Sequence, residues 1–286
     1  RSDRNNVVRA LARQEAHIPL HLSADRQEAM PGDTVRFTID FSNTGSRTAS
    51  DLTITDYIDQ HGNIDNTRYI DGSLESTAAG ALEYLDSESG EWVQIEPPAD
   101  RVKGIRLRLN QLEPAEGGQI TFLTEIMEDH LSSYIYNSSF ADYTGGDTQP
   151  YQTVSNEVAV LVSPVSEVFI GPSGNPDAPG GSSEDVVINT LNLQDSVYIF
   201  EHEIMNSGNF LDTLAVAFSD STVLPEGWSL EFVDSTGAVI QEGSDFTVVL
   251  GPVPPGESVE AGLRFRSTPD RFRSFQGSRR KHRDAA

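Results

Sequence analysis

The chain has 286 residues, of which 37% are hydrophobic and 8% aromatic, and a formal net charge of −24. This length is enough for about two domains of ordinary size, each able to bury a core. The sequence has no cysteine, which excludes disulfides, thiolate metal sites and cysteine nucleophiles, and it has no run of about 18 to 20 apolar residues that would form a transmembrane segment.

The charge is concentrated in the body of the chain. Residues 1–20 carry a net charge of +2 and residues 269–286 a net charge of +4, which leaves −30 for residues 21–268. Such a surface repels the phosphates of nucleic acids and of anionic membranes, so no nucleic acid partner is expected. Cations and basic partners are favoured instead.

Residues 1–20 have four arginines and no apolar stretch like that of a signal peptide. We expect them to form a leader or linker segment ahead of a domain at 21–163. On this reading the chain is either cytosolic, or it begins after processing or inside a longer protein.

The stretch from Pro31 to Asp56 predicts a strand, a turn and a second strand. Apolar and polar residues alternate over 35–42, the pattern of a strand with one buried face. The turn follows at Asn43-Thr44-Gly45, because Asn and Gly tolerate positive φ. Alternation resumes at Leu52 and Ile54.

Short strands continue to residue 162. We predict a hairpin around the turn 86–90 and further strands at 105–109, 119–127, 134–143 and 155–162. No amphipathic helix of three turns occurs in this half of the chain. The fold class is therefore expected to be all-β, with a β-sandwich at 21–163.

A stretch dense in Pro, Gly and Ser at 163–184 marks a domain boundary. A second series of predicted strands follows and defines a second sandwich at 164–268. Strand alternation stops at Pro269, so this sandwich is expected to lack its last strand. Residues 269–286 are expected to be a disordered basic tail, a segment that docks elsewhere, or an artefact of the reading frame. The predicted strands of this half are a short one at 168–170, followed by a long loop, and strands at 197–204, 214–218, 228–232, 246–250 and 261–265.

The two halves follow one plan. Asn43-Thr44-Gly45 corresponds to Asn206-Ser207-Gly208, and the turn at Pro114 corresponds to the turn at Pro255. The first copy is longer by about 22 residues, which we place in an insertion at about 56–90. Chance similarity between hairpins of like composition is the alternative.

The sequence also resembles a known family. The runs that carry the resemblance are PGDTVRFTIDFSNTGSRTASDLTITDYID, TRYIDGSLE, VKGIRLRLNQLEPAEGGQITF and TVSNEVAVLV. Over about residues 20–163 they are similar to the conserved-repeat domains of prokaryotic surface proteins, also called the domain of unknown function eleven. Residues 165–268 are similar to a second kind of module found after such domains.

The resemblance implies two tandem immunoglobulin-like β-sandwich domains. It further implies an extracellular or cell-envelope location, a structural or adhesive role, and no catalytic residues. The residues agree with the last point, because the sequence has no nucleophile elbow, zinc-binding or phosphate-binding motif and its six histidines are scattered. His202 lies within a predicted strand, where a structural role is favoured, so we do not expect an enzyme.

Calcium is the one ion for which residues gather. Six oxygen-bearing side chains crowd one polar loop, and hard cations bind such oxygens. Solvated turn residues are the alternative, since Asp and Asn dominate turns in any case. The candidate Ca²⁺ ligands are Asp56, Asp59, Asn63, Asp65, Asn66 and Asp71.

Seven aromatic residues raise the question of a glycan ligand. They could form a platform on which sugars stack, but alternation places most of them on strands, where packing in the core or on a sheet face is favoured. Asn137-Ser138-Ser139 is also a glycosylation sequon. The seven residues are Trp92, Trp228, Tyr84, Tyr134, Tyr136, Tyr143 and Tyr151.

The sequence therefore favours a non-enzymatic structural or interaction module of a bacterial or archaeal cell envelope, surface-layer-associated or adhesin-like. It would act as a spacer and contact other envelope proteins, or itself, through edge strands. The alternative is a carbohydrate-binding or accessory module of a secreted enzyme. We expect specificity to lie in the segment 56–90, in the loop 171–184 and at the unpaired end of the second domain.

Overall fold

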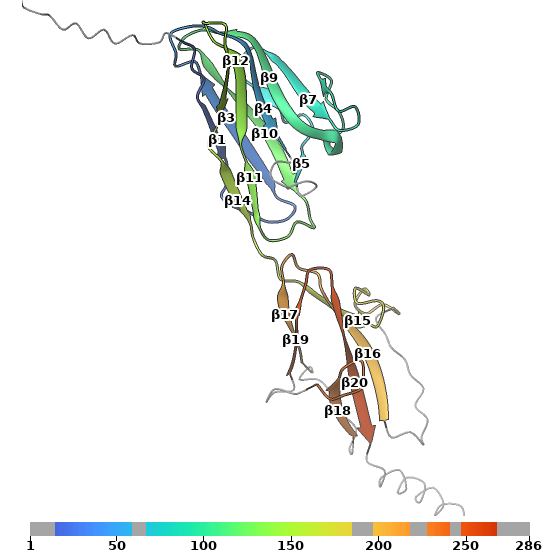
Figure 1. Ribbon diagram of the computed structural model, residues 1–286. Helices are drawn as coiled ribbons and strands as arrows, with labels where there is room; N and C mark the ends of the chain where they lie inside the picture. The colour runs from blue at the N-terminus through green and yellow to red at the C-terminus, as the bar shows by residue number, and fades with distance from the viewer. Residues whose placement is uncertain (1–14, 59–66, 185–196, 218–227, 241–246, 268–286) are drawn as a thin grey trace, which may run out of the picture. The chain divides into compact units, whose positions relative to one another are not determined.

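The computed structural model describes residues 15–58, 67–184, 197–217, 228–240 and 247–267. Within these ranges the chain is all-β, with one short 3-10 turn, η2 (Ala99–Arg101), and no α-helix (Figure 1). The chain divides into two compact units, Arg1–Ser163 and Pro164–Ala286. The predicted class of tandem all-β sandwiches is confirmed.

The first unit has two large sheets and one small one. The first large sheet has the order β1-β3-β10-β5, with β6 also pairing β10, and the second has the order β13-β12-β4-β9-β7-β8. A small sheet, β11-β14-β2, closes the unit, and its β14 runs parallel to β2. The strands of the first large sheet are β1 (Leu20–Ala24), β3 (Thr34–Ser42), β10 (Gly117–Ile126), β5 (Thr67–Tyr69) and β6 (Glu75–Ser76). Those of the second are β13 (Pro150–Val154), β12 (Ser139–Thr144), β4 (Ala49–Tyr57), β9 (Val102–Leu112), β7 (Ala81–Asp86) and β8 (Trp92–Val93). Those of the small sheet are β11 (Tyr134–Asn137), β14 (Val158–Val162) and β2 (Glu28–Ala29).

Alternation along the strands builds the core between the two large sheets. Ile39 on β3 pairs with Leu22 and Ile120, and all three side chains are buried. Ile54 on β4 pairs with Leu107 in the same way on the opposite sheet. Each strand therefore turns one face inward, as the period of two predicts.

Residues 15–20 belong to this unit, which corrects their assignment to a leader. Ala16 is 4% exposed and Ile18 is 0% exposed, and both pack in the core. His17 O accepts a hydrogen bond from Thr44 N, and Leu20 begins β1. Apolar residues spaced two apart were present here, but the preceding arginines and Pro19 obscured the pattern. The rest of the predicted leader lies outside the described residues.

The predicted insertion at 56–90 forms strands of both large sheets. β4 continues through Tyr57, and the segment then supplies β5 and β6 to one large sheet and β7 to the other. The extra residues therefore widen both sheets and do not form one polar loop outside the sandwich. Residues 59–66, within the predicted insertion, lie outside the described residues.

The second unit has a four-stranded sheet, β15-β16-β20-β18, and a two-stranded sheet, β17-β19. Ile204 and Ala261 from the first sheet pack against Leu214 and Val248 from the second. The strands are β15 (Val168–Pro172), β16 (Val197–Asn206), β17 (Asp212–Ala217), β18 (Trp228–Val233), β19 (Thr247–Val253) and β20 (Ser258–Ser267).

The two units repeat one strand order. The order β15-β16-β20-β18 of the second unit matches β1-β3-β10-β5 of the first, and β17-β19 matches β4-β9. Asn43 follows β3, and Asn206 ends β16, in corresponding positions. Each is 0% exposed, and each accepts a hydrogen bond on its side-chain Oδ1 from the glycine two residues later at 3.0 Å. The predicted internal repeat is therefore present in the fold.

The first unit continues after β10 with β11 to β14, whereas the described residues of the second unit end with β20. Counterparts of β11 to β14 are thus absent from the described part of the second unit. The basic tail 269–286 lies outside the described residues, so its predicted state stays a prediction.

Candidate interaction surfaces

Three aromatic rings form a row on the outer face of the six-stranded sheet. Tyr57 follows the inward-facing Asp56 on β4, and Phe140 follows the inward-facing Ser139 on β12, so alternation directs both rings outward. The ring centroids of Tyr57 and Phe140 lie 5.8 Å apart, and those of Tyr57 and Trp92 lie 6.1 Å apart. All three side chains are half-buried.

Gly104 on β9 makes this row possible. It pairs with Tyr57 on β4, and a Cβ atom here would lie 3.0 Å from Tyr57 Cδ1 and 3.2 Å from Trp92 Cη2. Because glycine has no side chain, the rings of Tyr57 and Trp92 can approach each other over β9. The row thus extends across the sheet from β12 over β4, β9 and β7 to β8.

A cation covers one end of the row. The guanidinium carbon of Arg106 lies 4.3 Å from the centroid of Trp92, a cation–π contact. Arg106 also donates its Nε hydrogen to Glu83 Oε2, and Arg108 lies 3.6 Å from the other carboxylate oxygen of Glu83. Glu83 is 5% exposed, so these ion pairs fix the orientation of Arg106 over the indole.

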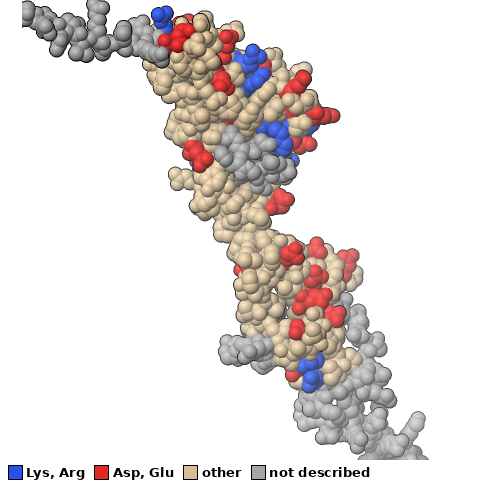
Figure 2. Space-filling view, viewed as in Figure 1, with Lys and Arg blue, Asp and Glu red and all other residues tan. Residues whose placement is uncertain are grey.

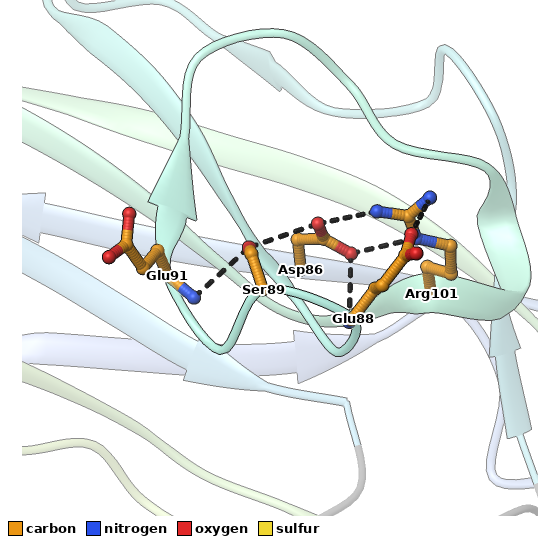
Figure 3. Close-up of polar contacts among 5 residues, drawn as sticks. All are labelled: Asp86, Glu88, Ser89, Glu91 and Arg101. Carbon is orange, nitrogen blue, oxygen red and sulfur yellow. Dashed lines mark hydrogen bonds and ion pairs between the residues drawn. The ribbon is translucent and has the colours of Figure 1, made fainter.

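A hydrogen-bonded hairpin supports Trp92 (Figure 3). Arg101 donates to both carboxylate oxygens of Asp86, from Nε at 2.8 Å and from Nη2 at 2.6 Å. Ser89 Oγ and Glu88 N also donate to this carboxylate. The Arg101 guanidinium holds the pKa of Asp86 well below its ordinary value. These contacts hold together the turn between β7 and β8, directly before Trp92.

An apolar edge occurs in the second unit. β15 is the terminal strand of the four-stranded sheet, and Val168, Phe169 and Ile170 are 52%, 39% and 50% exposed. Beside it lies a groove of about 430 Å³, lined by residues that include Ile170, Phe200 and Phe265. Exposed apolar residues on an edge strand are typical of a protein contact surface.

His202 lines this groove as well. It is half-buried, and its Nδ1 lies 3.3 Å from Phe200 O. No group of three or more potential metal-ligating side chains occurs within the described ranges. The expected structural role of His202 stays a prediction.

Two of the six candidate calcium ligands, Asp56 and Asp71, lie among the described residues. Asp56 is the penultimate residue of β4 and is 0% exposed, where it accepts hydrogen bonds from Ser139 and Asn137. The prediction that Asp56 lies in a polar loop was wrong. The residues that follow Asp56 include many polar ones, but β4 continues through Tyr57. Asp71 is exposed in a turn. Asp59, Asn63, Asp65 and Asn66 lie outside the described residues, so a calcium site among them stays a prediction.

The seven predicted aromatic residues divide into several groups. Tyr84 and Tyr143 are buried, as expected for core packing. Tyr134 and Tyr136 form an exposed pair on β11, with ring centroids 5.9 Å apart. Trp228 is half-buried on β18, and Tyr151, also half-buried, stacks on Tyr143. Trp92 alone of the seven joins the aromatic row.

The sequence did not identify Tyr57 and Phe140 as members of that row. Alternation would have placed both on the outer faces of their strands, but their adjacency depends on pairing between strands more than 80 residues apart in the chain. Phe140 pairs with Thr55, and this register brings its ring beside Tyr57. Within each strand, alternation indicates which side chains face outward. It does not indicate which residues of two different strands lie side by side.

The sequon at Asn137 marks a change of sheet. The predicted single strand 134–143 is divided here into β11, which pairs β14, and β12, which pairs β4. Asn137 is 5% exposed and uses its Nδ2 in a hydrogen bond to Asp56 Oδ2. A glycan on that nitrogen is incompatible with this packing.

Charge is distributed unevenly over the surface. Figure 2 shows acidic side chains over both units on the face viewed, with several Lys and Arg side chains on the first unit and a smaller basic patch on the second. In the first unit, the hairpin contains Arg101, which pairs with Asp86. Beside the aromatic row lie Arg106 and Arg108, which pair with Glu83. Among the described residues, no helix is long and apolar enough to span a bilayer.

The sequence matches no protein-family model, and it matches no curated protein. Several solved structures align with the chain at low identity. The major pilin subunit BcpA of Bacillus cereus aligns at 9% identity with a TM-score of 0.34, over 86% of this chain and 58% of that one. The full-length major pilin SpaD of Corynebacterium diphtheriae aligns at 8% identity with a TM-score of 0.36, over 86% of this chain and 51% of that one.

A collagen-binding domain from a Staphylococcus aureus adhesin aligns at 13% identity with a TM-score of 0.28, over 48% of this chain and 96% of that domain. This chain therefore spans little more than half the length of the two pilins. At these identities and scores, the alignments carry no conclusion about the activity, ligand or partner of this chain.

Proposed function

We propose that the chain is a non-enzymatic structural and interaction module of a bacterial or archaeal cell envelope, adhesin-like or surface-layer-associated. In this role it serves as a spacer and as a protein–protein contact outside the cell. Membership of the conserved-repeat family is part of the proposal. It is supported by the sequence resemblance over residues 20–163.

The observation that carries the proposal is the repeated plan of the two units. Each has its own buried apolar cluster, and each closes its two sheets with a buried asparagine, Asn43 or Asn206. Units that fold around separate cores can be joined in series without depending on one another. Such a chain gains reach with every copy, which suits a spacer.

The contact surface in this proposal is the edge strand β15. Its residues Val168 to Ile170 expose apolar side chains, and on the side away from β16 its backbone has no strand partner among the described residues. An extended segment of another envelope protein, or of a second copy, can add to such an edge by main-chain hydrogen bonds. Apolar side chains alternating along that segment would fill the adjacent groove.

Light scattering and crosslinking test the contact. We expect the full chain to form concentration-dependent oligomers or to crosslink to a protein on cells that carry it. Phe169→Lys should weaken this association about tenfold or more, because it places a charge on an apolar contact residue. Ile95→Lys is the matched control, since Ile95 is 86% exposed but lies on no strand edge.

A monodisperse monomer at high concentration, with no crosslinked partner on cells, contradicts the contact proposal. Equal effects of Phe169→Lys and Ile95→Lys would contradict the assignment to β15. Near-ultraviolet circular dichroism of each variant shows that the fold is retained.

A second candidate function is binding of a carbohydrate, as an accessory module of a secreted enzyme. The observation that favours it is the row of Phe140, Tyr57 and Trp92 on one sheet face. Sugar rings stack on aromatic rings in such rows, and the guanidinium of Arg106 supplies hydrogen-bond donors beside Trp92.

A glycan array with the full chain tests this candidate. Trp92→Ala should reduce binding of any glycan found by about tenfold or more, as expected for a central aromatic contact. The double variant Tyr134→Ala with Tyr136→Ala is the control, because this exposed pair lies on β11 away from the row. No binding on the array, or equal losses in both variants, would count against the aromatic row.

A further inference from the structure

Asp56 is a carboxyl group enclosed in the core of the first unit. It is 0% exposed and faces inward from β4, opposite Ser139 on β12 and Ile105 on β9. Ser139 donates its hydroxyl hydrogen to Asp56 Oδ2 at 2.6 Å. Asn137 donates from Nδ2 to the same oxygen at 3.2 Å. Both donors are neutral, so neither compensates a buried negative charge.

Two oxygens beside these hydrogen bonds have no partner. Asp56 Oδ1 and Asn137 Oδ1 are both buried and make no hydrogen bond to any described residue. If Asp56 is ionised, both atoms are acceptors only, and each incurs the penalty of a buried unsatisfied polar atom. A protonated carboxyl has one O–H donor. One proton on Asp56 Oδ1 would therefore let this oxygen donate a hydrogen bond and Asn137 Oδ1 accept it.

Several charged or titratable groups lie on the elements packed against Asp56. On β9, Arg106 points to the outer face, where it binds Glu83, and Lys103 is half-buried. On β12, Asp142 accepts a hydrogen bond from Gln152.

Other titratable side chains of the unit are also buried, among them His130 and Tyr69. Between β10 and β11, His130 is 1% exposed, with Nδ1 against Leu131 O. On β5, in the other large sheet, Tyr69 is 0% exposed and its hydroxyl oxygen accepts a hydrogen bond from Leu74 N. The test below therefore includes His130 and Lys103.

We propose that Asp56 carries a proton in the folded chain and donates it from Oδ1 to Asn137 Oδ1, which closes an acid–amide pair. The Asn137 amide donates to Asp56 Oδ2, and Asp56 donates back to the Asn137 carbonyl. No covalent bond forms, and the proton comes from solvent. The pair links the end of β4 to the corner between β11 and β12. The first unit is therefore most stable against unfolding when this proton is present.

Burial raises the pKa of Asp56 to about 7, although the hydrogen bonds from Ser139 and Asn137 lower it. The pKa of an unfolded aspartate is about 3.9. The folded chain therefore binds the proton more tightly than the unfolded chain, and the stabilisation is complete below pH about 4. It is lost as the pH rises toward 7 and beyond. Between pH 5 and pH 8, the folding equilibrium constant of the first unit should fall roughly a hundredfold.

Denaturant unfolding of the full chain tests the proposal. The chain has two tryptophans, Trp92 in the first unit and Trp228 in the second, so Trp228→Phe leaves a fluorescence reporter for the first unit alone. In this background we expect the midpoint to fall from pH 5 to pH 8. Asp56→Asn should keep a high midpoint at both pH values, because an amide donates to Asn137 Oδ1 without titrating.

Two control variants separate Asp56 from its neighbours. His130→Gln and Lys103→Gln should retain the pH dependence of the unsubstituted chain. If Asp56→Asn keeps that pH dependence, or if either control abolishes it, the proposal is overturned. A midpoint that does not change between pH 5 and pH 8 in the unsubstituted chain overturns it as well.

A second measurement needs no variant at Asp56, which guards against a variant that fails to fold. Carbon-13 NMR of the aspartate carboxyl groups in the folded chain should show one group that titrates near neutral pH. If every aspartate carboxyl titrates below pH 5, Asp56 is ionised in the folded chain and the pair does not form.

Discussion

Asn43 donates a hydrogen from its side-chain Nδ2 to Leu112 O at 2.9 Å and thereby joins the ends of two strands that belong to opposite sheets. Asn206 makes the same bond to Val253 O at 2.8 Å in the second unit. A second hydrogen of each amide goes to a carbonyl four residues later, Arg47 or Phe210. The asparagine of the repeated Asn-x-Gly turn is therefore a clasp, a side chain that links two sheets of its unit by hydrogen bonds.

Removing this clasp should destabilise one unit at a time. Asn43→Ala leaves Leu112 O, Arg47 O and Gly45 N without their partner, which should lower the free energy of unfolding of the first unit by about 3 kcal/mol. Denaturant midpoints from Trp92 fluorescence, in the Trp228→Phe background, measure it. Asn110→Ala, at an exposed position of β9, is the control and should change the midpoint little. Equal effects of the two substitutions would contradict the clasp.

The glycines of the two turns are required for a different reason. A Cβ atom on Gly45 would collide with the backbone of Glu15 and His17, and one on Gly208 would collide with Val165 O. Gly45→Ala should therefore lower the stability of the first unit by about 1–3 kcal/mol, as overpacking does. Thermal denaturation measures the loss. Gly180→Ala is the matched control, because a Cβ there meets no atom within 4 Å. A Gly45→Ala protein as stable as the control would show that the segment 15–18 can move away.

Much of the fold was predictable because strands carry a local signal. Alternation at 35–42 predicted β3, and the paired Asn-x-Gly turns predicted the repeat. The failures share one cause, which is that partners distant in the chain decide the outcome. Asp56 lies in a polar run that looks like a loop, and only Ser139 and Asn137, more than 80 residues later, make its burial tolerable. Ile18 is buried because Thr153 and the turn at 43–45 cover its segment.

The candidate surfaces were predictable only in part. Trp92 was identified, but its row with Tyr57 and Phe140 depends on strand register, which alternation within one strand does not specify. The edge β15 was foreseen only as a short strand beside a loop. Its three exposed apolar residues become informative once the order β15-β16-β20-β18 places it at the end of the sheet.

The hairpin that supports Trp92 should respond to acid. Because Arg101 lowers the pKa of Asp86 below that of an unfolded aspartate, the carboxylate stabilises the folded chain at pH values above about 4. That stabilisation is lost as the pH falls through the folded pKa. Asp86→Asn should therefore lower the Trp92 unfolding midpoint at pH 7 and have a smaller effect at pH 3.

Glu91→Gln is the control for this prediction. The Glu91 side chain is exposed, and Glu91 joins the hairpin through its backbone, where N donates to Ser89 Oγ and O accepts from Asp86 N. It should not change the midpoint at either pH. An Asp86→Asn effect that is equal at pH 7 and pH 3 would show that the ion pair with Arg101 does not stabilise the fold.

The two units should unfold in separate steps, the second unit first. Among the described residues, the buried apolar cluster of the first unit has 29 side chains and that of the second has seven. Because stabilisation grows with buried apolar area, the smaller cluster should give way at a lower denaturant concentration. Trp228 fluorescence in a Trp92→Phe chain should therefore change before Trp92 fluorescence in a Trp228→Phe chain. Asn206→Ala should lower only the Trp228 transition, since its clasp joins β16 to β19 within the second unit. A single coincident transition from both reporters would instead mean that the two units stabilise each other.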